Sequence, residues 1–559
     1  MKINACIILL ACLAVLSLSW AQDFHLLSNE ILDEIWSFHP VTATHLGIHK
    51  YDKQMPDYTK KSRNQKLERF RHLAKQLDKI DTTALSEDDV VDYYLLRAFL
   101  YDEIFDLETG SIYEQNPLLY ARSCIDGVYT IMTRHAASPE KRMQVVTARL
   151  KEIPGFLETA QENIARPPAL LCEVGIDQLN EGEKFIEAVF ESYKDSLPDA
   201  ARMEFQQAKI AAVAAMMHFA YWLETNQDAD ARYLLGEDGY NCKLRNIHFV
   251  DFDADSLLSI GEYYLARTTE MIDSLYLLLT PAARQLVELP RDFGRDDVID
   301  YRNEEIEYLR NFIAAANIVT IPEAVGNVEI VETPRFLRSI IPGMAMIPPG
   351  PFDSGRTSYF FVSPVPVKFN KGEAEYYYNY VSNRWFREGA VHEAYPGHHL
   401  QLSISNQHPS VVRRTFRSFF LIEGWALYCE EMMAMSGLYE DTIGAMINAL
   451  EYVKYRAVRI IVDVKLQTGA FAYADALQFM TTTLQGNESY YAREIKRYIS
   501  NPIQPSSYLI GKIQLLELKE AYKRLKGDDF DLKVFHDELL SHGSIPIKLI
   551  KRLMLEQGK

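Results

Sequence analysis

The residues with the clearest chemistry are 392–401, which read HEAYPGHHLQ. This stretch places three imidazoles beside a carboxylate. Neutral imidazoles bind Zn²⁺ at about 2.0–2.1 Å, and a neighbouring glutamate can take a proton from a metal-bound water whose pKa has fallen to roughly 7. The stretch therefore predicts a metal hydrolase, with His392 as a ligand and Glu393 as the general base.

The spacing leaves the second histidine ligand open. In the common H-E-x-x-H motif the histidines lie four residues apart on one helix face, but here that position is Pro396. The next histidines, His398 and His399, follow two and three residues later. A regular helix, at ~100° per residue, returns to the face of His392 at His399. Pro396 and Gly397 favour a bulged or unwound helix, which would bring His398 to the metal instead.

A carboxylate ligand is available in residues 421–432, LIEGWALYCEEM, which read as an apolar helix with acidic side chains. Glu423 lies 25 residues beyond His398, and a helix–loop–helix of that length can return it to the metal. Because its neighbours are apolar, this carboxylate needs a partner. Two histidines and Glu423 leave a fourth position for water. Glu430 and Glu431 are interpreted as solvated acids or as acids that support a ligand by a hydrogen bond.

Four segments carry a resemblance to a known family: HEAYPGHHLQ, EGWALYCEEM, YRAVRIIVD and RYISNPIQPSSYLIGKIQLLEL. They resemble the bacterial domain-of-unknown-function 885 family (DUF885), whose members carry an HExxPGH signature. That family is distantly similar to the helical zinc carboxypeptidases and dipeptidases of the gluzincin type. The resemblance implies a mainly α, two-lobed, zincin-like metallopeptidase fold. It also places the second histidine ligand directly after Pro-Gly, at His398.

The resemblance implies a role for Tyr508, which follows the helix-opening segment Gln504-Pro505-Ser506-Ser507. In the related helical carboxypeptidases a similarly placed tyrosine is implied to bind the oxyanion. A phenol suits this task because it donates a hydrogen bond while staying neutral at working pH. A core tyrosine without contact to substrate is the competing interpretation.

Two positions depart from the family pattern. Gln467 stands where a histidine is usual, and a glutamine cannot be protonated, so an acidic or cationic role there is in doubt. Ile503 stands where a glycine is usual, which we interpret as a local loop change. Nearby, Arg456, Arg459 and Asp463 have a helical spacing that suggests an internal ion pair or support of the site.

Composition excludes some classes of partner. The chain has 559 residues, of which 48% are hydrophobic, and it can bury a large core. Its 77 acidic and 59 basic residues give a net charge of −18. Nucleic acid and anionic membranes are therefore poor partners, because both need a basic surface. Beyond residue 21 the chain has four widely spaced cysteines, which are interpreted as buried thiols that could include one disulfide, namely Cys124, Cys172, Cys242 and Cys429.

The N-terminal residues 1–21 predict a secretory signal peptide. A basic start, an apolar run from Ile7 to Leu18 and small residues before Gln22 fit a cleaved signal. Lipidation at Cys12 is the alternative, although the apolar run continues past that cysteine. No later window approaches ~18 consecutive apolar residues, so we expect a secreted or periplasmic protein without a membrane span.

Helical periodicity covers most of residues 22–559 and predicts a single mature, mainly α domain. We expect two lobes, an N-terminal helical lobe at about 22–317 and a catalytic lobe at about 318–559. Long helices are predicted over 178–224 and 374–400, among others.

A small sheet or hairpin is predicted near residues 325–365, where short β-type runs alternate with Pro- and Gly-rich segments. The runs are Asn327 to Val331, Met344 to Ile347 and Ser358 to Val362. The sheet could hold an extended substrate by β-augmentation or serve only in packing.

We therefore expect a peptidase in which His392, His398 and Glu423 bind Zn²⁺, with short peptides as substrates. The alternatives are a zinc amidohydrolase or esterase acting on a non-peptide substrate, and a helical binding protein with a structural metal. Glu393 favours catalysis, because a structural site needs no general base. Carboxypeptidase or dipeptidase action is implied by the resemblance and would need a cation near the metal. Four arginines are fairly close in sequence, namely Arg356, Arg413, Arg414 and Arg417.

Overall fold

The computed structural model describes residues 22–133, 137–278, 295–338, 341, 343–363, 383–440 and 442–556. The chain forms two compact units. The first contains the residues up to Ala231 and the segment Pro409–Phe416, and the second contains Arg232–His408 and Arg417–Leu555. The expected signal peptide lies outside the described residues.

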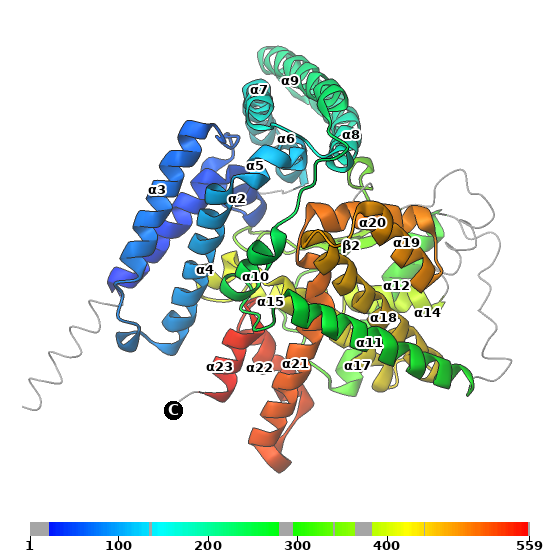
Figure 1. Ribbon diagram of the computed structural model, residues 1–559. Coiled ribbons are helices and arrows are strands. Elements are labelled where there is room, and N and C mark those ends of the chain that lie inside the picture. Colours follow the sequence, from blue (N-terminus) through cyan, green and yellow to red (C-terminus); the bar gives the residue numbers. More distant parts are fainter. Residues whose placement is uncertain are drawn as a thin grey trace, which may run out of the picture. The chain divides into compact units, whose positions relative to one another are not determined.

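The first unit is built from helices (Figure 1). They are 22–38, α2 (Pro40–Leu46), α3 (Lys60–Leu77), α4 (Glu87–Thr109), α5 (Ser111–Gln115), α6 (Pro117–Thr133), α7 (Pro139–Asn163), α8 (Ala169–Tyr193), α9 (Asp199–Asn226) and α16 (Val411–Thr415). The prediction of one helix over 178–224 is wrong, because α8 and α9 are separate. Pro198 precedes the first residue of α9, and a proline cannot continue the hydrogen bonding of α8.

The second unit contains the remaining helices and the strands (Figure 1). The helices are α10 (Gly236–Asn246), α11 (Ala254–Tyr276), α12 (Arg295–Ala316), α14 (Asn383–Glu393), α15 (His398–Ser405), α17 (Phe419–Met435), α18 (Thr442–Gln467), α19 (Tyr473–Leu484), α20 (Glu488–Ser500), α21 (Gln504–Lys526), α22 (Leu532–Ser541) and α23 (Ile547–Leu555). The strands are β1 (Val328–Glu332), β2 (Met344–Ile347) and β3 (Ser358–Val362). The mainly α prediction is confirmed.

The division between the units lies at Ala231, earlier than the boundary near residue 317 that the sequence suggests. Helices α10 and α11 belong to the second unit because their apolar faces join its core. Leu257 of α11 packs in one cluster with Ala457 and Ile460 of α18. Such contacts join segments some 200 residues apart, so local periodicity does not report them.

The three strands form a small mixed sheet with β3 in the centre. β1 pairs with β3 in parallel, and β2 pairs with β3 in antiparallel orientation. Phe360 of β3 lies beside Ile330 on one side and Met346 on the other, and all three are buried. The predicted small sheet is confirmed.

The cysteines and the hydrophobicity of the helices bear on two further expectations from the sequence. All four cysteines in the described chain are free thiols, and Cys124, Cys172 and Cys429 are buried. Among the described helices, none combines the length and hydrophobicity needed to cross a membrane.

Helix α17 is mostly apolar and is buried along almost its whole length. Such a helix must be covered all round, and α14, α15, α18 and α21 pack against it. Its closest approach is to α21, where Gly424 faces Gly511. A Cβ at Gly511 would overlap the Phe420 carbonyl oxygen, and a Cβ at Gly424 would lie 2.5 Å from the Gly511 carbonyl carbon. Only glycine lets these two helix backbones meet.

We predict that Gly511→Ala lowers the free energy of unfolding by roughly 1–3 kcal/mol or more, because α17 and α21 must separate. Gly155→Ala is the matched control, since a Cβ at Gly155 in α7 meets nothing within 4 Å. That change should be neutral or stabilise by roughly 0.5–1 kcal/mol. Urea denaturation of both variants measures the difference, and equal effects would contradict the close contact.

Candidate metal centre

The helix predicted over 374–400 is broken at the motif, and its start lies outside the described residues. α14 ends at Glu393, residues 394–397 form a turn, and α15 begins at His398. The expected unwinding at Pro396 and Gly397 is therefore observed.

Two contacts fix this turn. Trp425 in α17 donates a hydrogen bond from Nε1 to the Pro396 carbonyl oxygen over 2.8 Å. At Gly397 a Cβ would overlap the His392 carbonyl oxygen, so the turn folds back on the end of α14 without room for a side chain. The break is thus a packed feature that sets the direction of both helices.

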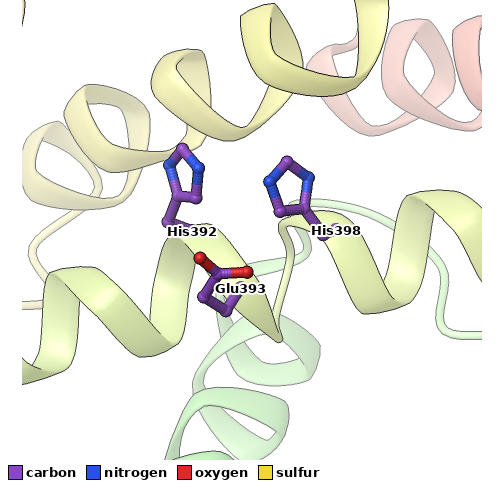
Figure 2. Close-up of side chains that lie close together, drawn as sticks. All are labelled: His392, Glu393 and His398. Carbon is purple, nitrogen blue, oxygen red and sulfur yellow. The ribbon is translucent and has the colours of Figure 1, made fainter. Parts of the chain in front are cut away.

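His392 and His398 face each other across the break. Their ring centroids lie 4.7 Å apart, at an interplanar angle of 84°. One potential ligand atom from each of His392, Glu393 and His398 lies within 4.8 Å of the other two. Figure 2 shows both imidazoles projecting to the same side of the break. Each of these three residues is 8% exposed, so the cluster is buried but reachable.

Glu423 reaches the same point from α17. Its Oε2 lies 3.6 Å from His392 Nε2 and 3.3 Å from His398 Nε2. Ligand atoms at about 2.0–2.2 Å from a tetrahedral metal lie roughly 3.3–3.5 Å from one another. Within the described chain this buried Oε2 has no hydrogen-bond partner. The arrangement therefore leaves one oxygen and two nitrogens directed at a common point.

Two neighbours orient these groups. His392 donates from Nδ1 to Glu430 Oε1 over 2.6 Å, which leaves the lone pair of Nε2 for a metal. Gln504 in α21 donates from Nε2 to Glu423 Oε1 over 3.0 Å. Because Oε1 is occupied, Oε2 is the oxygen available as a ligand. Support of a ligand by a Glu430 hydrogen bond was one of the two interpretations offered from the sequence. No sequence pattern pointed to the contact of Gln504 with Glu423.

His399 lies on the other side of α15, against the sheet. Its Nδ1 lies 2.7 Å from Ser358 Oγ, and its Nε2 lies 3.1 Å from the Gly326 carbonyl oxygen and 3.0 Å from the Tyr395 hydroxyl. It is fully buried, and burial lowers its pKa to about 4. Both ring nitrogens are therefore engaged in packing, so the structure brings His398 and not His399 to the cluster.

The charges of the cluster favour a cation. Burial alone would lower the pKa of His392, but the neighbouring carboxylates of Glu423 and Glu430 raise it to about 9. Burial alone would raise the pKa of Glu423, yet His398 and His392 hold it well below its usual range. The acids thus stabilise positive charge at this point. A divalent metal supplies that charge while both imidazoles stay neutral.

The donor set decides which metal fits. Two imidazole nitrogens and one carboxylate oxygen suit Zn²⁺, whereas Mg²⁺ and Ca²⁺ prefer oxygen ligands. Three protein ligands leave a coordination position for water or substrate. His392, His398 and Glu423 are therefore the residues that would hold the ion.

Tyr508 lies beside the cluster, with its ring stacked on His392 at 6.1 Å between centroids and 17° between planes. Gln504 Nε2 donates to the Tyr508 hydroxyl oxygen over 3.1 Å. The phenol proton is therefore free to point elsewhere. Burial, together with the charge of Glu423, raises the pKa of Tyr508, which keeps it a neutral donor.

The departures at Gln467 and Ile503 are explained by backbone contacts. Gln467 Oε1 accepts a hydrogen bond from the Leu235 amide over 3.0 Å, so this side chain holds the start of α10. Ile503 has a φ of 73°, a left-handed value that favours glycine. Asp463 Oδ1 accepts a hydrogen bond from the Ile503 amide over 3.2 Å and holds this turn in place.

Asp463 therefore does not form the ion pair suggested by its spacing from the two arginines. Its Oδ2 accepts hydrogen bonds from Tyr240 over 2.8 Å and from Ser506 over 2.6 Å. The arginines lie instead over the Tyr508 ring, with guanidinium carbons 4.0 Å (Arg459) and 5.3 Å (Arg456) from its centroid.

The four arginines proposed from sequence as cations near the metal have other surroundings. Arg413 is fully buried in the first unit, where it pairs with Asp88 and Asp92. Arg414 belongs to the same unit. Arg417 donates to Asn406 over 2.7 Å, and Arg356 donates to the Ala324 carbonyl oxygen over 3.5 Å.

Comparison with known proteins assigns the chain to a family. The profile of the bacterial proteins of unknown function DUF885 matches residues 40–554. The chain belongs to this family. Among the curated proteins, none matches the chain.

Two solved structures share the DUF885 chain's fold. One, from Shewanella oneidensis, is described as "a putative lipoprotein of unknown function"; it is 24% identical, with a TM-score of 0.76 over 95% of this chain and 99% of that chain. The other, with a similar description, comes from Colwellia psychrerythraea; it is 19% identical, with a TM-score of 0.78 over 96% of this chain and 99% of that chain.

We predict that this DUF885 protein binds about one zinc per chain, and that His398→Ala abolishes binding while His399→Gln retains it. His399→Gln should instead lower the thermal unfolding temperature, because it disturbs contacts with Ser358 and Gly326. Elemental analysis of dialysed protein measures the metal, and calorimetry measures the unfolding. Zinc loss confined to His399→Gln would contradict the assignment of His398.

Proposed function

We propose that the protein is a zinc-dependent peptidase that hydrolyses peptide bonds without an acyl-enzyme. The observation that carries the proposal is the position of the Glu423 carboxylate. Its Oε2 has no hydrogen-bond partner within the described chain and lies at the spacing of metal ligands from the imidazoles of His392 and His398. A second carboxylate, that of Glu393, is adjacent to His392 in the sequence. A purely structural site would fill all four coordination positions and would need no such glutamate. The position of Glu393 therefore supports catalysis.

Zinc bound there would polarise a carbonyl and lower the pKa of a water molecule. Glu393 follows His392 directly, and within the described chain its Oε2 is buried without a hydrogen-bond partner. That oxygen can accept a proton from the attacking water and return it to the leaving amine. Tyr508, whose oxygen already accepts from Gln504, can donate its proton in a hydrogen bond to the developing oxyanion. Gln504 thereby orients a ligand and a donor together.

We predict that Glu393→Gln retains zinc and fold but loses ~10²–10⁴ in kcat, because an amide cannot accept the proton. Glu431→Gln is the matched control, since Glu431 pairs with Lys512 on α21 and lies outside the cluster. Turnover of a short peptide library, followed by mass spectrometry, measures both variants. A zinc-replete Glu393→Gln with unchanged kcat would overturn the proposed function.

We also propose that the protein is exported, as its first 21 residues suggest. The lipoprotein descriptions of the two structural relatives favour lipidation at Cys12, the alternative to release by cleavage before Gln22. Intact mass analysis of the protein from its own host distinguishes the two, because lipidation leaves an acylated Cys12 as the first residue. A chain that retains Met1 would contradict export.

A further inference from the structure

Arg456 and Arg459 in α18 are charged groups with unused donors. They are 7% and 3% exposed, respectively, and the Nε of each is buried without a partner. Within the described chain, the Arg456 guanidinium makes no hydrogen bond. Arg459 makes one long hydrogen bond, of 3.5 Å, to Gln504 Oε1. Buried guanidinium groups normally have their donors satisfied, so an unsatisfied pair indicates a missing ligand.

The nearby carboxylates do not fill this role. Glu430 Oε1 lies 3.9 Å from Arg456 Nη2 and already accepts the short hydrogen bond from His392. Glu494 is satisfied by Arg497, which binds both its oxygens, and by the hydroxyls of Tyr455 and Tyr498. The nearby carboxylates therefore leave donors of both arginines available, and the pair suits an added anion.

The pair lies next to the candidate metal centre. Both guanidinium groups lie over the ring of Tyr508, which stacks on His392. Glu430 links Arg456 to His392 directly. An anion bound by this pair would thus be held beside the imidazoles that would carry the metal.

We propose that Arg456 and Arg459 form the anchor for the C-terminal carboxylate of the substrate, which makes the protein an exopeptidase that acts on peptides with a free C-terminus. This inference rests on the proposed peptidase function and names its substrate class. A guanidinium suits the task because its planar donors match the two oxygens of a carboxylate.

The separation between the arginines and the candidate metal centre limits how far from the C-terminus the peptide is cut. Arg459 lies 4.0 Å from the Tyr508 centroid, and that ring lies 6.1 Å from His392. An extended residue spans about 3.3–3.6 Å. The Arg459 guanidinium carbon therefore lies at most about 10 Å from the His392 ring, which about three extended residues can span, so the products are short fragments released from the C-terminus.

Two other roles for the pair make different predictions. If the arginines only hold Tyr508 in place, their loss lowers kcat for every substrate equally. If they bind a small inorganic anion, chloride changes the cleavage of all substrates alike and competes with a carboxylate ligand. Anchoring of the substrate predicts instead an effect confined to substrates with a free carboxylate.

The test compares a short peptide with its C-terminally amidated form, each at low and high chloride. Wild-type protein should prefer the free acid by on the order of 10²-fold or more in kcat/KM. Arg456→Gln should lower kcat/KM for the acid by roughly 10²-fold, mainly through KM, and leave the amide unchanged. Arg456→Lys, which keeps the charge but loses the planar donors, is the second variant. Arg493→Gln is the control, because Arg493 is exposed on α20.

A binding measurement separates this inference from the proposed function. Calorimetry on the metal-free full chain should detect N-acetylphenylalanine but not its amide, and Arg456→Lys should weaken that binding. Equal cleavage of acid and amide by wild-type protein would overturn the anchor and leave the peptidase intact. Equal losses on both substrates, or displacement of the ligand by chloride, would also overturn it. Absence of any zinc-dependent cleavage, with carboxylate binding retained, would refute the peptidase alone.

Discussion

The candidate metal centre depends on one buried carboxylate, that of Glu423. A carboxylate in an apolar helix is costly unless both oxygens have partners. Here the oxygens are divided, with the Gln504 amide on Oε1 and the two imidazoles facing Oε2. Residue 504 can reach Glu423 because α17 and α21 touch at Gly424 and Gly511. The closeness of two backbones thus determines the chemistry of the cluster.

Acidic and basic side chains alternate with increasing distance from the Glu423 carboxylate. His392 lies between Glu423 and Glu430, and Arg456 lies beyond Glu430. Every one of these groups is carried by a helix, so their positions are set by packing and not by loops. Groups held in this way need little reorganisation when charge develops in a reaction. Arg456 is the last group in this series, and the proposed carboxylate of the substrate would be the next negative charge beside it.

The sequence predicts local structure better than it predicts the contacts between distant segments. The mainly α fold, the small sheet and the unwinding at Pro396 follow from local composition, because proline, glycine and periodicity act over a few residues. Pro198 was a local signal of the break between α8 and α9. The role of Gln504 had no local signal, since it depends on a contact with Glu423, a residue 81 positions away on another helix. The neighbours of Arg456 were hidden for the same reason.

The broken helix changes what the two histidines depend on. In an unbroken H-E-x-x-H helix, one backbone fixes the separation of both ligands. Here His398 begins a new helix, whose direction is set by the Trp425 hydrogen bond to Pro396 and by the contact of His399 with Ser358 in β3. The sheet and α17 therefore share control of the second ligand. His399, the residue next to His398, thus connects the second ligand to β3, so the position of His398 depends on the packing of the sheet as well as on its own helix.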